Sequence, residues 1–277
     1  MSWEPYAALP SSTVTGTLLR WEGVGDANHA PRTILAWLPP SYASQPDKHY
    51  PVVYLHDGQN VFDTATSYNL SEWGADETLT ALAAEGLEAI AVAIPNANER
   101  RYHEYSPVRH PGFPPEVQGG GGGDAYLDFL TDTVKPLADN HLRTLPDAAH
   151  TVLLGSSMGG LISLHALLTR PKVFGNAGVM SPAFWACAGE AFERVRSSPA
   201  IAGKVWLDIG GKEGTDHPEQ EQAYWDDAHA MRDLLLAKGM GERLRFQADP
   251  EGIHRETAWK VRLPEALRFL LGGMDSD

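Results

Sequence analysis

One segment of the chain has the residue types and spacing of a nucleophilic site. Residues 151–163 read TVLLGSSMGGLIS, so an apolar run leads into Gly155, Ser157 and Gly159 in a G-x-S-x-G frame, and a helical apolar pattern follows. In the order strand, tight turn, helix, this frame is typical of a nucleophile elbow, which lifts a serine hydroxyl above a sheet. Glycines suit the flanking positions because a Cβ there would collide with neighbouring backbone. The pattern predicts Ser157 as a nucleophile.

The histidine best placed to activate Ser157 is His254. A serine hydroxyl needs a base to take its proton and a carboxylate to orient that base. In hydrolases with this elbow, the acid and then the histidine follow the serine along the chain, each after a strand. His254 lies between the last predicted strand and the last predicted helix, whereas His229 falls inside a predicted helix and His217 in a loop of Gly, Asp and Pro. His254 is therefore the predicted base.

The acid has three candidates around the strand predicted at Lys204–Ile209. Glu213 lies in the turn beyond the strand end and is preferred for that position. Asp208 lies in the strand itself. Asp216 is a loop residue that could instead cap the next helix. The sequence ranks Glu213 first and leaves the two aspartates open.

Two backbone N–H groups are expected to hold the negative charge that develops on the substrate oxygen. Met158 follows the nucleophile at a helix start and is predicted to supply one. The second is expected from the turn after an earlier strand, where residues 56–60 read HDGQN. Gln59 is preferred, with Gly58 second. The alternative is that this segment is an ordinary Asp-Gly turn.

These residues need a sheet to bring them together, and the hydrophobic pattern predicts one. Strands alternate with helical segments, so we expect an α/β fold whose central sheet is mostly parallel, flanked by helices on both faces, in one domain over 1–277. Residues 1–30 would supply edge strands, and the long loop at 95–123 would lie near the site. The predicted strands are Thr13–Arg20, Thr33–Leu38, Pro51–His56, Glu88–Ile94, a run ending at Leu154, Phe174–Met180, Lys204–Ile209 and Arg243–Ala248. The predicted helices are Leu70–Ala84, one from an Asp124 N-cap to Leu142, one after Gly159, Pro218–Lys238 and Glu256–Leu271.

The net charge of the chain argues against anionic macromolecules as binding partners. The chain has 22 Lys and Arg against 36 Asp and Glu, a net charge of −14. Nucleic acid and anionic membrane surfaces would repel it, so a small-molecule ester is the expected partner. An acidic chain with exposed aromatic side chains could also form a homodimer.

The cysteine and histidine patterns indicate neither a disulfide nor a metal centre. Cys187 is the only cysteine, which fits a reducing compartment. The first residues, MSWEPY, lack the basic and apolar regions of a signal peptide, so a cytoplasmic protein is expected. Neither an H-x-x-x-H nor a paired-Cys spacing occurs, and no metal or other cofactor is predicted.

The motifs together resemble the putative esterase family of α/β-hydrolases, which includes enterochelin-esterase-like trilactone hydrolases, S-formylglutathione hydrolases, feruloyl esterases and the antigen 85 mycolyltransferases. The resemblance begins near Thr33 and runs through nearly the whole chain. It rests on five segments: YLHDGQNVFD from Tyr54, GSSMGG from Gly155, MSPAFW from Met180, LDIGGKE from Leu207 and HRETAW from His254.

The resemblance implies an α/β-hydrolase fold and an ester-hydrolysing activity. It implies Ser157 as nucleophile, His254 as base and Gln59 as the second oxyanion donor. It also implies an acid in the frame that ends at Glu213, where many family members have Asp. We expect a serine carboxylesterase for small or aromatic esters that works through an acyl-enzyme. The alternatives are a siderophore trilactone esterase, a thioesterase or S-formylglutathione hydrolase, an acyltransferase, and a non-catalytic binding module. Four residues are expected to line the substrate pocket: Asp57, Arg101, Trp185 and Trp259.

Overall fold

A computed structural model describes residues 2–110, 119–214 and 218–274. Its strands form one nine-stranded sheet in the order β1-β2-β3-β5-β4-β6-β7-β8-β9. Strands β5, β4, β6, β7, β8 and β9 are parallel to one another, while β1, β2 and β3 add an antiparallel edge. The strands are β1 Glu4–Pro5, β2 Thr17–Val24, β3 Arg32–Leu38, β4 Val52–His56, β5 Ile90–Ile94, β6 Thr151–Ser156, β7 Asn176–Met180, β8 Val205–Lys212 and β9 Leu244–Ile253.

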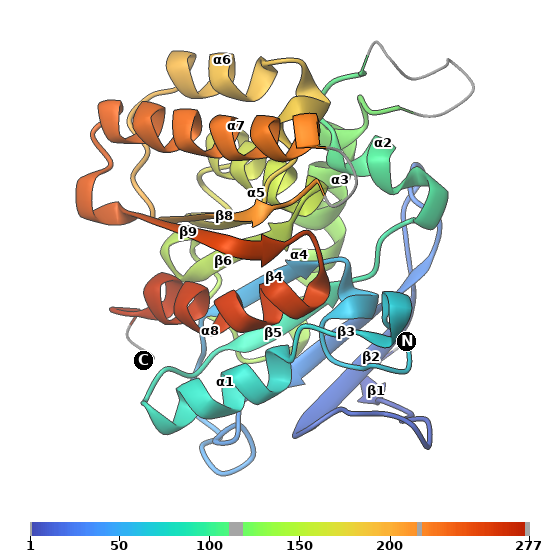
Figure 1. Ribbon diagram of the computed structural model, residues 1–277. Coiled ribbons are helices and arrows are strands. Elements are labelled where there is room, and N and C mark those ends of the chain that lie inside the picture. Colours follow the sequence, from blue (N-terminus) through green and yellow to red (C-terminus); the bar gives the residue numbers. More distant parts are fainter. Residues whose placement is uncertain (1, 111–118, 215–217, 275–277) are drawn as a thin grey trace.

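Helices cover both faces of this sheet, as the sequence predicted for an α/β-hydrolase fold (Figure 1). Helices α1 and α8 lie on one face, and α3 to α7 lie on the other. The helices are α1 Ala75–Ala84, α2 Arg101–Tyr105, α3 Gly123–Phe129, α4 Lys135–His141, α5 Met158–Thr169, α6 Glu190–Ser197, α7 Pro218–Ala237 and α8 Glu256–Leu271. A π-helical turn at Leu130–Val134 joins α3 to α4.

The alternation of side chains along each strand builds a separate core on each face. In β4, Val52 and Tyr54 pack into the core under α3 to α7, whereas Val53 and Leu55 pack into the core under α1 and α8. All residues of β4 are buried. Successive side chains of a strand point to opposite faces, so a strand that is covered on both faces must be apolar throughout. This explains why the central strands read as unbroken apolar runs.

The first long strand begins later than its apolar pattern predicted. The prediction began at Thr13, and β2 begins at Thr17. The Thr13 N–H donates to the Asp63 carboxylate at 3.3 Å, and the Thr15 N–H donates to Asp76 at 2.5 Å. These backbone groups are used by side chains and are not available to a strand ladder.

Three helical predictions also differ from the structure. The helix predicted from Leu70 begins at Ala75, because Gly74 just before it has a left-handed conformation, with a φ of 60°, that a right-handed helix cannot include. Asp124 is not the N-cap of α3; it lies in the first turn and contacts His165 Nε2 at 2.9 Å. The segment 95–123, predicted as a loop, contains the short helix α2, and α6 was not predicted.

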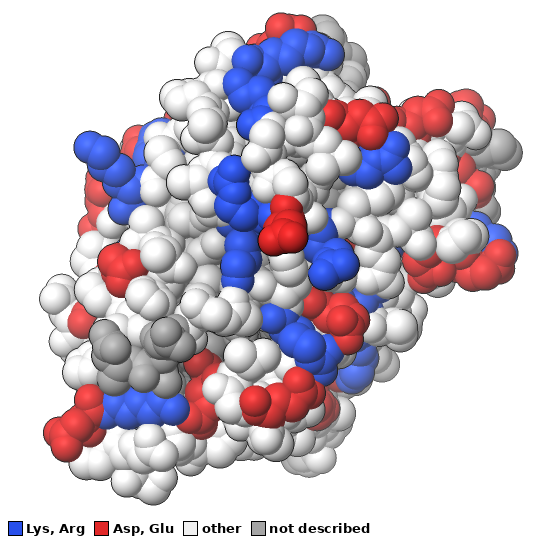
Figure 2. All heavy atoms as spheres, turned by 90° about the vertical axis from the view of Figure 1, so that its left-hand side faces the viewer, with Lys and Arg blue, Asp and Glu red and all other residues white. Residues whose placement is uncertain are grey.

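Cations gather at the end of the sheet where the parallel strands begin. Figure 2 looks onto this side and shows several Lys and Arg side chains near its middle. Lys204 Nζ donates to the carbonyl of Phe269, Lys238 Nζ to that of Arg196, and Arg243 to that of Gly239. These groups satisfy carbonyls at or near the ends of α8, α6 and α7, where helices leave their last carbonyls unpaired.

Among the described residues, no helix is both long enough and apolar enough to cross a membrane.

Candidate active site

Ser157 lies in a strained turn between β6 and α5. Its φ of 57° and ψ of −121° are unusual for a residue with a Cβ, and such a conformation costs about 1–3 kcal/mol. Backbone hydrogen bonds on both sides hold it, because Ser157 N–H donates to Met180 at 2.9 Å and its carbonyl accepts from Ala183 at 3.1 Å. Strain that the surrounding structure maintains is typical of functional sites. The elbow predicted from the sequence is therefore present.

The glycines of the elbow are needed for close packing. A Cβ on Gly155 would lie 2.9 Å from the Cα of Gly159 and 2.9 Å from His56 Cδ2. A Cβ on Gly159 would lie 3.3 Å from the Cβ of His56 and 3.7 Å from Asp57 Oδ2. The elbow thus packs directly against the turn that follows β4, which brings Ser157 close to the predicted oxyanion loop.

His254 and Glu213 are brought together by the register of the last two strands. Lys212, the last residue of β8, pairs with Ile253, the last residue of β9. Glu213 and His254, which follow directly, therefore lie next to each other. His254 Nδ1 is 2.7 Å from Glu213 Oε2, the geometry in which a carboxylate orients an imidazole. Burial alone would raise the pKa of Glu213, but the hydrogen bond and charge of His254, helped by Ser181, hold that pKa below its ordinary value. Glu213 is therefore ionised at neutral pH.

The other two candidate acids do not take this position. Asp208 is fully buried and points toward Arg262, whose NH1 is 3.2 Å from its Oδ1, and toward Trp206, whose indole N–H donates to its Oδ2 at 2.7 Å. Burial raises the pKa of Asp208 to about 6. Asp216 lies outside the described residues, as does His217.

The turn after β4 has the geometry to present a backbone donor. Asp57 is left-handed, with φ 52° and ψ 45°, and opens the short 3-10 turn Gly58–Asn60. Gly58 approaches β5 so closely that a Cβ would lie 2.7 Å from the carbonyl carbon of Ala93. Gln59 is fixed at both ends, since its side-chain oxygen accepts from the Asn96 N–H at 3.1 Å and its carbonyl accepts from the Thr66 hydroxyl at 2.8 Å.

Asp57 is locked by an arginine from α2. Arg101 donates to Asp57 through Nε at 2.6 Å and through NH2 at 2.8 Å, and the Asn96 amide donates to the same carboxylate at 2.6 Å. Burial would raise the pKa of Asp57, but the charge of Arg101 lowers it below the ordinary value. The Asp57–Arg101 pair fixes the start of α2 against the candidate oxyanion turn.

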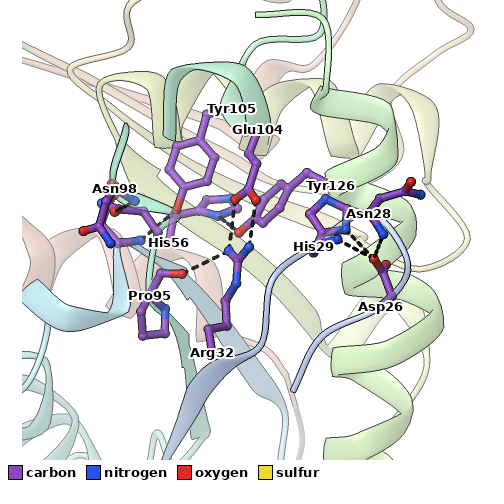
Figure 3. A network of polar contacts seen from close by, with 12 residues as sticks. Asp26, Asn28, His29, Arg32, His56, Pro95, Asn98, Glu104, Tyr105 and Tyr126 are labelled. Atoms are coloured by element: carbon purple, nitrogen blue, oxygen red, sulfur yellow. Dashed lines mark hydrogen bonds and ion pairs between the residues drawn. The ribbon is translucent and has the colours of Figure 1, made fainter. Parts of the chain in front are cut away.

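A buried polar network supports the same turn from behind (Figure 3). The Tyr105 hydroxyl accepts from the Asp57 N–H at 3.1 Å, and the Tyr126 hydroxyl lies 2.9 Å from His56 Nδ1. Burial lowers the pKa of His56 to about 3, so this imidazole is neutral. No local pattern in the sequence marks Tyr105 or Tyr126, because their contacts with Asp57 and His56 form only when α2 and α3 pack over β4.

Ser157 and His254 line one cavity of about 610 Å³. Of the four residues expected in the pocket, Asp57, Arg101 and Trp259 are among those that line this cavity and Trp185 is not. The Trp185 ring instead lies 6.3 Å from that of Tyr224, and 41% of the residue is exposed. Most of the lining residues have polar side chains: the remaining ones are Gln59, Asn60, Thr66, Ser67, Tyr68, Trp73, Asn96, Asn98, Ser156, Arg255 and Glu256.

Tyr224 on α7 is a site residue that the sequence analysis missed. Its ring centroid is 5.2 Å from that of His254, and the residue is buried. Burial raises the pKa of its hydroxyl, while hydrogen bonding to Trp185 and Ser157 partly offsets that rise. Its helical spacing in the sequence gave no signal beyond that of an ordinary core position.

Three carboxylates near the cavity are already partly neutralised by a lysine. Glu72, Asp76 and Glu77 offer oxygens within 4.8 Å of one another, the kind of donor set that could hold a cation. Lys260 Nζ is 2.5 Å from Glu72, so an ammonium group already lies beside these carboxylates. The cluster is not among the residues that surround Ser157 and His254.

The sequence matches the family model described as "Putative esterase" over residues 27–270. The chain belongs to the putative esterase family. The protein is accordingly an ester-hydrolysing enzyme with an α/β-hydrolase fold.

Two relatives show how far the sequence of this esterase is shared. It is 26% identical over 244 residues to "Uncharacterized protein YbbA" of Bacillus subtilis, and the aligned residues cover 87% of this chain and 93% of that protein. It is 31% identical over 144 residues to "Siderophore enterobactin esterase" of Emericella nidulans, which covers 48% of this chain and 46% of that one.

A solved structure shares the fold of this esterase. The IroE-like serine hydrolase from Shewanella oneidensis superposes with a TM-score of 0.74 and 23% identity, covering 94% of this chain and 82% of that one.

Proposed function

We propose that this esterase is a serine carboxylesterase in which Ser157 is the nucleophile, His254 the base and Glu213 the acid. The observation that carries the proposal is the 2.7 Å contact between His254 Nδ1 and Glu213, made beside the strained Ser157 turn. Orientation by Glu213 leaves Nε2 of the imidazole to take the hydroxyl proton. The Tyr224 ring, tilted against that of His254 with the centroids 5.2 Å apart, limits the movement of the imidazole.

The proposed reaction proceeds through an acyl-enzyme. His254 takes the Ser157 proton as the serine oxygen bonds to the ester carbonyl carbon, and the carbonyl oxygen becomes an oxyanion held by the N–H groups of Met158 and Gln59. The bond to the leaving alcohol then breaks, and His254 returns its proton to that alcohol. A water molecule, deprotonated by His254, attacks the acyl carbon, and Ser157 recovers its proton as the acid is released.

The proposed substrates are small or aromatic carboxylic esters. The cavity has a volume of about 610 Å³, and three aromatic residues, Tyr68, Trp73 and Trp259, are among those that line it. Its many amide, hydroxyl and charged groups favour esters that also carry polar substituents, since such groups offer partners to the donors and acceptors of the wall.

A siderophore ester is the second candidate substrate. The relative from Emericella nidulans is named a siderophore enterobactin esterase. Arg101 and Arg255 lie in the cavity wall, and Arg255 is exposed. Arg101 is already paired with Asp57, so catecholate oxygens on such a substrate would be attracted mainly by Arg255.

The first test is hydrolysis of p-nitrophenyl acetate, butyrate and octanoate by the wild type and by Ser157→Ala. We expect hydrolysis of the short esters to fall with chain length and to be lost in the variant. Labelling by a fluorophosphonate should likewise depend on Ser157. Ser163→Ala is the matched control, because Ser163 bonds to the Gly159 carbonyl within α5 and should remain active and labelled.

The outcomes separate the candidate functions. Turnover by Ser157→Ala at the wild-type rate would contradict the serine mechanism. If the wild type is labelled but hydrolyses none of the three esters, a ferric catecholate trilactone and an acyl thioester become the next substrates to assay. Faster product formation with an added alcohol than with water alone would identify an acyltransferase.

A further inference from the structure

Behind the Glu213–His254 pair lies a buried arginine that is shared by two carboxylates. Arg262, on α8, is 1% exposed. Its NH1 is 3.2 Å from Asp208 Oδ1, and its NH2 is 3.9 Å from Glu213 Oε1. Both carboxylates are themselves buried. A guanidinium placed between two carboxylates out of water interacts strongly with both of them.

Ser181 connects this arginine to Glu213, and the chemistry of its partners fixes the direction of its hydrogen bonds. Its hydroxyl oxygen accepts from Arg262 NH2 at 2.8 Å and from Trp259 Nε1 at 3.0 Å. Arginine and tryptophan side chains are donors only, so the one proton of Ser181 is free to be donated elsewhere. It goes to Glu213 Oε1, at 2.5 Å.

The second oxygen of Glu213 is thereby left for His254. Oε1 receives the Ser181 hydroxyl and also the Gly210 N–H at 2.6 Å, while Oε2 contacts His254. Ser181 is a non-glycine residue with a φ of 39°, so its hydroxyl is held in place at some backbone cost. The orientation of Glu213 thus depends on Ser181, and that of Ser181 depends on Arg262.

The charges of the cluster complement the proposed chemistry. Asp208 and Glu213 carry two negative charges and Arg262 one positive charge, which leaves one net negative charge behind a neutral His254. When His254 takes the Ser157 proton, that charge is balanced. Without Asp208, the guanidinium would compete with the imidazolium for Glu213.

We propose that Arg262 and Asp208 are positioning residues of this esterase: Arg262 holds Ser181 and Glu213 in the orientation that His254 requires, and Asp208 neutralises Arg262 so that Glu213 keeps its negative charge for His254. The proposal rests on the proposed serine mechanism. It also gives a role to Asp208, which the sequence marked as an alternative acid.

The acid limb of kcat/KM against pH is the measurement that tests this, because it reports the pKa of the base in the free enzyme. Other ionisable groups close to His254 are Tyr224 on α7, Arg255 just before α8 and Glu256 in the first turn of α8, and those around Asp208 are Arg262 and Glu213. The variants below leave Tyr224, Arg255 and Glu256 unchanged.

Asp208→Asn removes one negative charge with little change of shape. We expect its acid limb to move to lower pH by about 0.5–1 unit, because the imidazolium loses a nearby negative charge. Arg262→Gln removes the positive charge, and the pKa of Asp208, which Arg262 lowers, then rises, so Asp208 takes up a proton. The net charge behind His254 is then nearly unchanged, and the acid limb should stay close to that of the wild type. The kcat of this variant should fall roughly tenfold, since Ser181 loses a donor. Arg262→Lys keeps the charge without the fork of donors and should lower kcat with the limb in place.

A merely structural role for Asp208 would lower the melting temperature and leave the acid limb where it is. A merely structural role for Arg262 would lower the melting temperature and leave kcat per labelled active site unchanged. Glu88→Gln is the matched control: Glu88 pairs with Lys48 at 2.7 Å just before β5, at the opposite end of the sheet, and its loss should not move the limb. A limb of Asp208→Asn that coincides with the wild type, or wild-type kcat in Arg262→Gln, would overturn the proposal. Should Asp208→Asn fail to fold, wild-type kcat in both Arg262→Gln and Arg262→Lys would overturn it.

The proposal and the serine mechanism can fail separately. An inactive Ser157→Ala, together with an unmoved limb in Asp208→Asn and wild-type kcat in Arg262→Gln, would reject only the roles of Arg262 and Asp208. An active Ser157→Ala would reject both.

Discussion

Replacement of Gly58 by alanine tests the candidate oxyanion turn with one methyl group. The added Cβ would lie 2.7 Å from the Ala93 carbonyl carbon and 2.7 Å from the Ile94 nitrogen. Carbon atoms in contact prefer about 3.5 Å or more, and both obstacles are backbone atoms of the buried strand β5, so the turn itself must move by roughly 0.8 Å. Gly58 has no left-handed φ, and the effect is therefore one of space and not of backbone strain.

The magnitude follows from that displacement. A hydrogen bond of about 2.9 Å that lengthens by roughly 0.8 Å is lost by ordinary geometric criteria. Loss of one oxyanion donor costs about 2.7–4 kcal/mol of transition-state stabilisation, equivalent to a 10²–10³-fold fall in kcat. We expect a fall of this size for Gly58→Ala on p-nitrophenyl acetate. KM should change much less, because the donor acts on charge that is present only in the transition state.

The assay compares kcat per active site, counted by fluorophosphonate labelling of Ser157. Gly86→Ala is the matched control, because Gly86 has nothing within 4 Å of its added Cβ and lies in the turn after α1. With its φ of 88°, it should lose about 1–2 kcal/mol of stability and keep its kcat. A Gly58→Ala enzyme that folds and retains kcat within threefold of the wild type would refute the assignment of the Gln59 N–H as a donor.

Three further predictions concern the cavity and its charges. Glu213→Gln should lower kcat by about 10³–10⁴-fold, because an amide cannot stabilise the imidazolium of His254; steady-state kinetics would contradict this if the fall were below tenfold. The pKa of Asp57 is depressed in the folded state, so its contribution to stability is present at neutral pH and is lost as the pH falls below about 4; urea unfolding of the wild type and Asp57→Asn should differ at pH 7, and the difference should shrink as the pH falls below about 4; a constant difference would exclude this linkage. Arg255→Gln should raise KM for an ester bearing a carboxylate or catecholate by roughly tenfold and leave p-nitrophenyl acetate unaffected, and equal effects on both substrates would show that Arg255 does not recognise charge.

Several elements could be predicted from local sequence because local chemistry determines them. The elbow needs a β-strand, glycines at fixed offsets and a following helix, all within residues 151–169, and the structure has β6, Ser157 and α5 in that order. Strand ends were less predictable. β2 begins at Thr17 and not at Thr13, since Asp63 and Asp76, distant in sequence, take the earlier backbone donors.

The identity of the acid could be predicted only in part, because it depends both on local sequence and on tertiary packing. Position after a strand ranked Glu213 first, and the register of β8 on β9 places it against His254. What separates Asp208 from that role is its direction: it points toward Arg262 and Trp206. A side-chain direction in a strand end is set by packing, which periodicity alone does not specify.

The sequence by itself determined the fold class, the nucleophile elbow and the order in which candidate serine, acid and histidine follow one another, because each depends on short-range patterns of glycine, apolar and polar residues. Only the tertiary structure decided what surrounds them. Ser181 and Arg262 are 81 residues apart, and Asp57 and Arg101 are 44 apart, yet each pair is in contact. Such contacts arise where the ends of parallel strands lie against helices that pack on the sheet. Local composition does not specify which distant residues are brought together there.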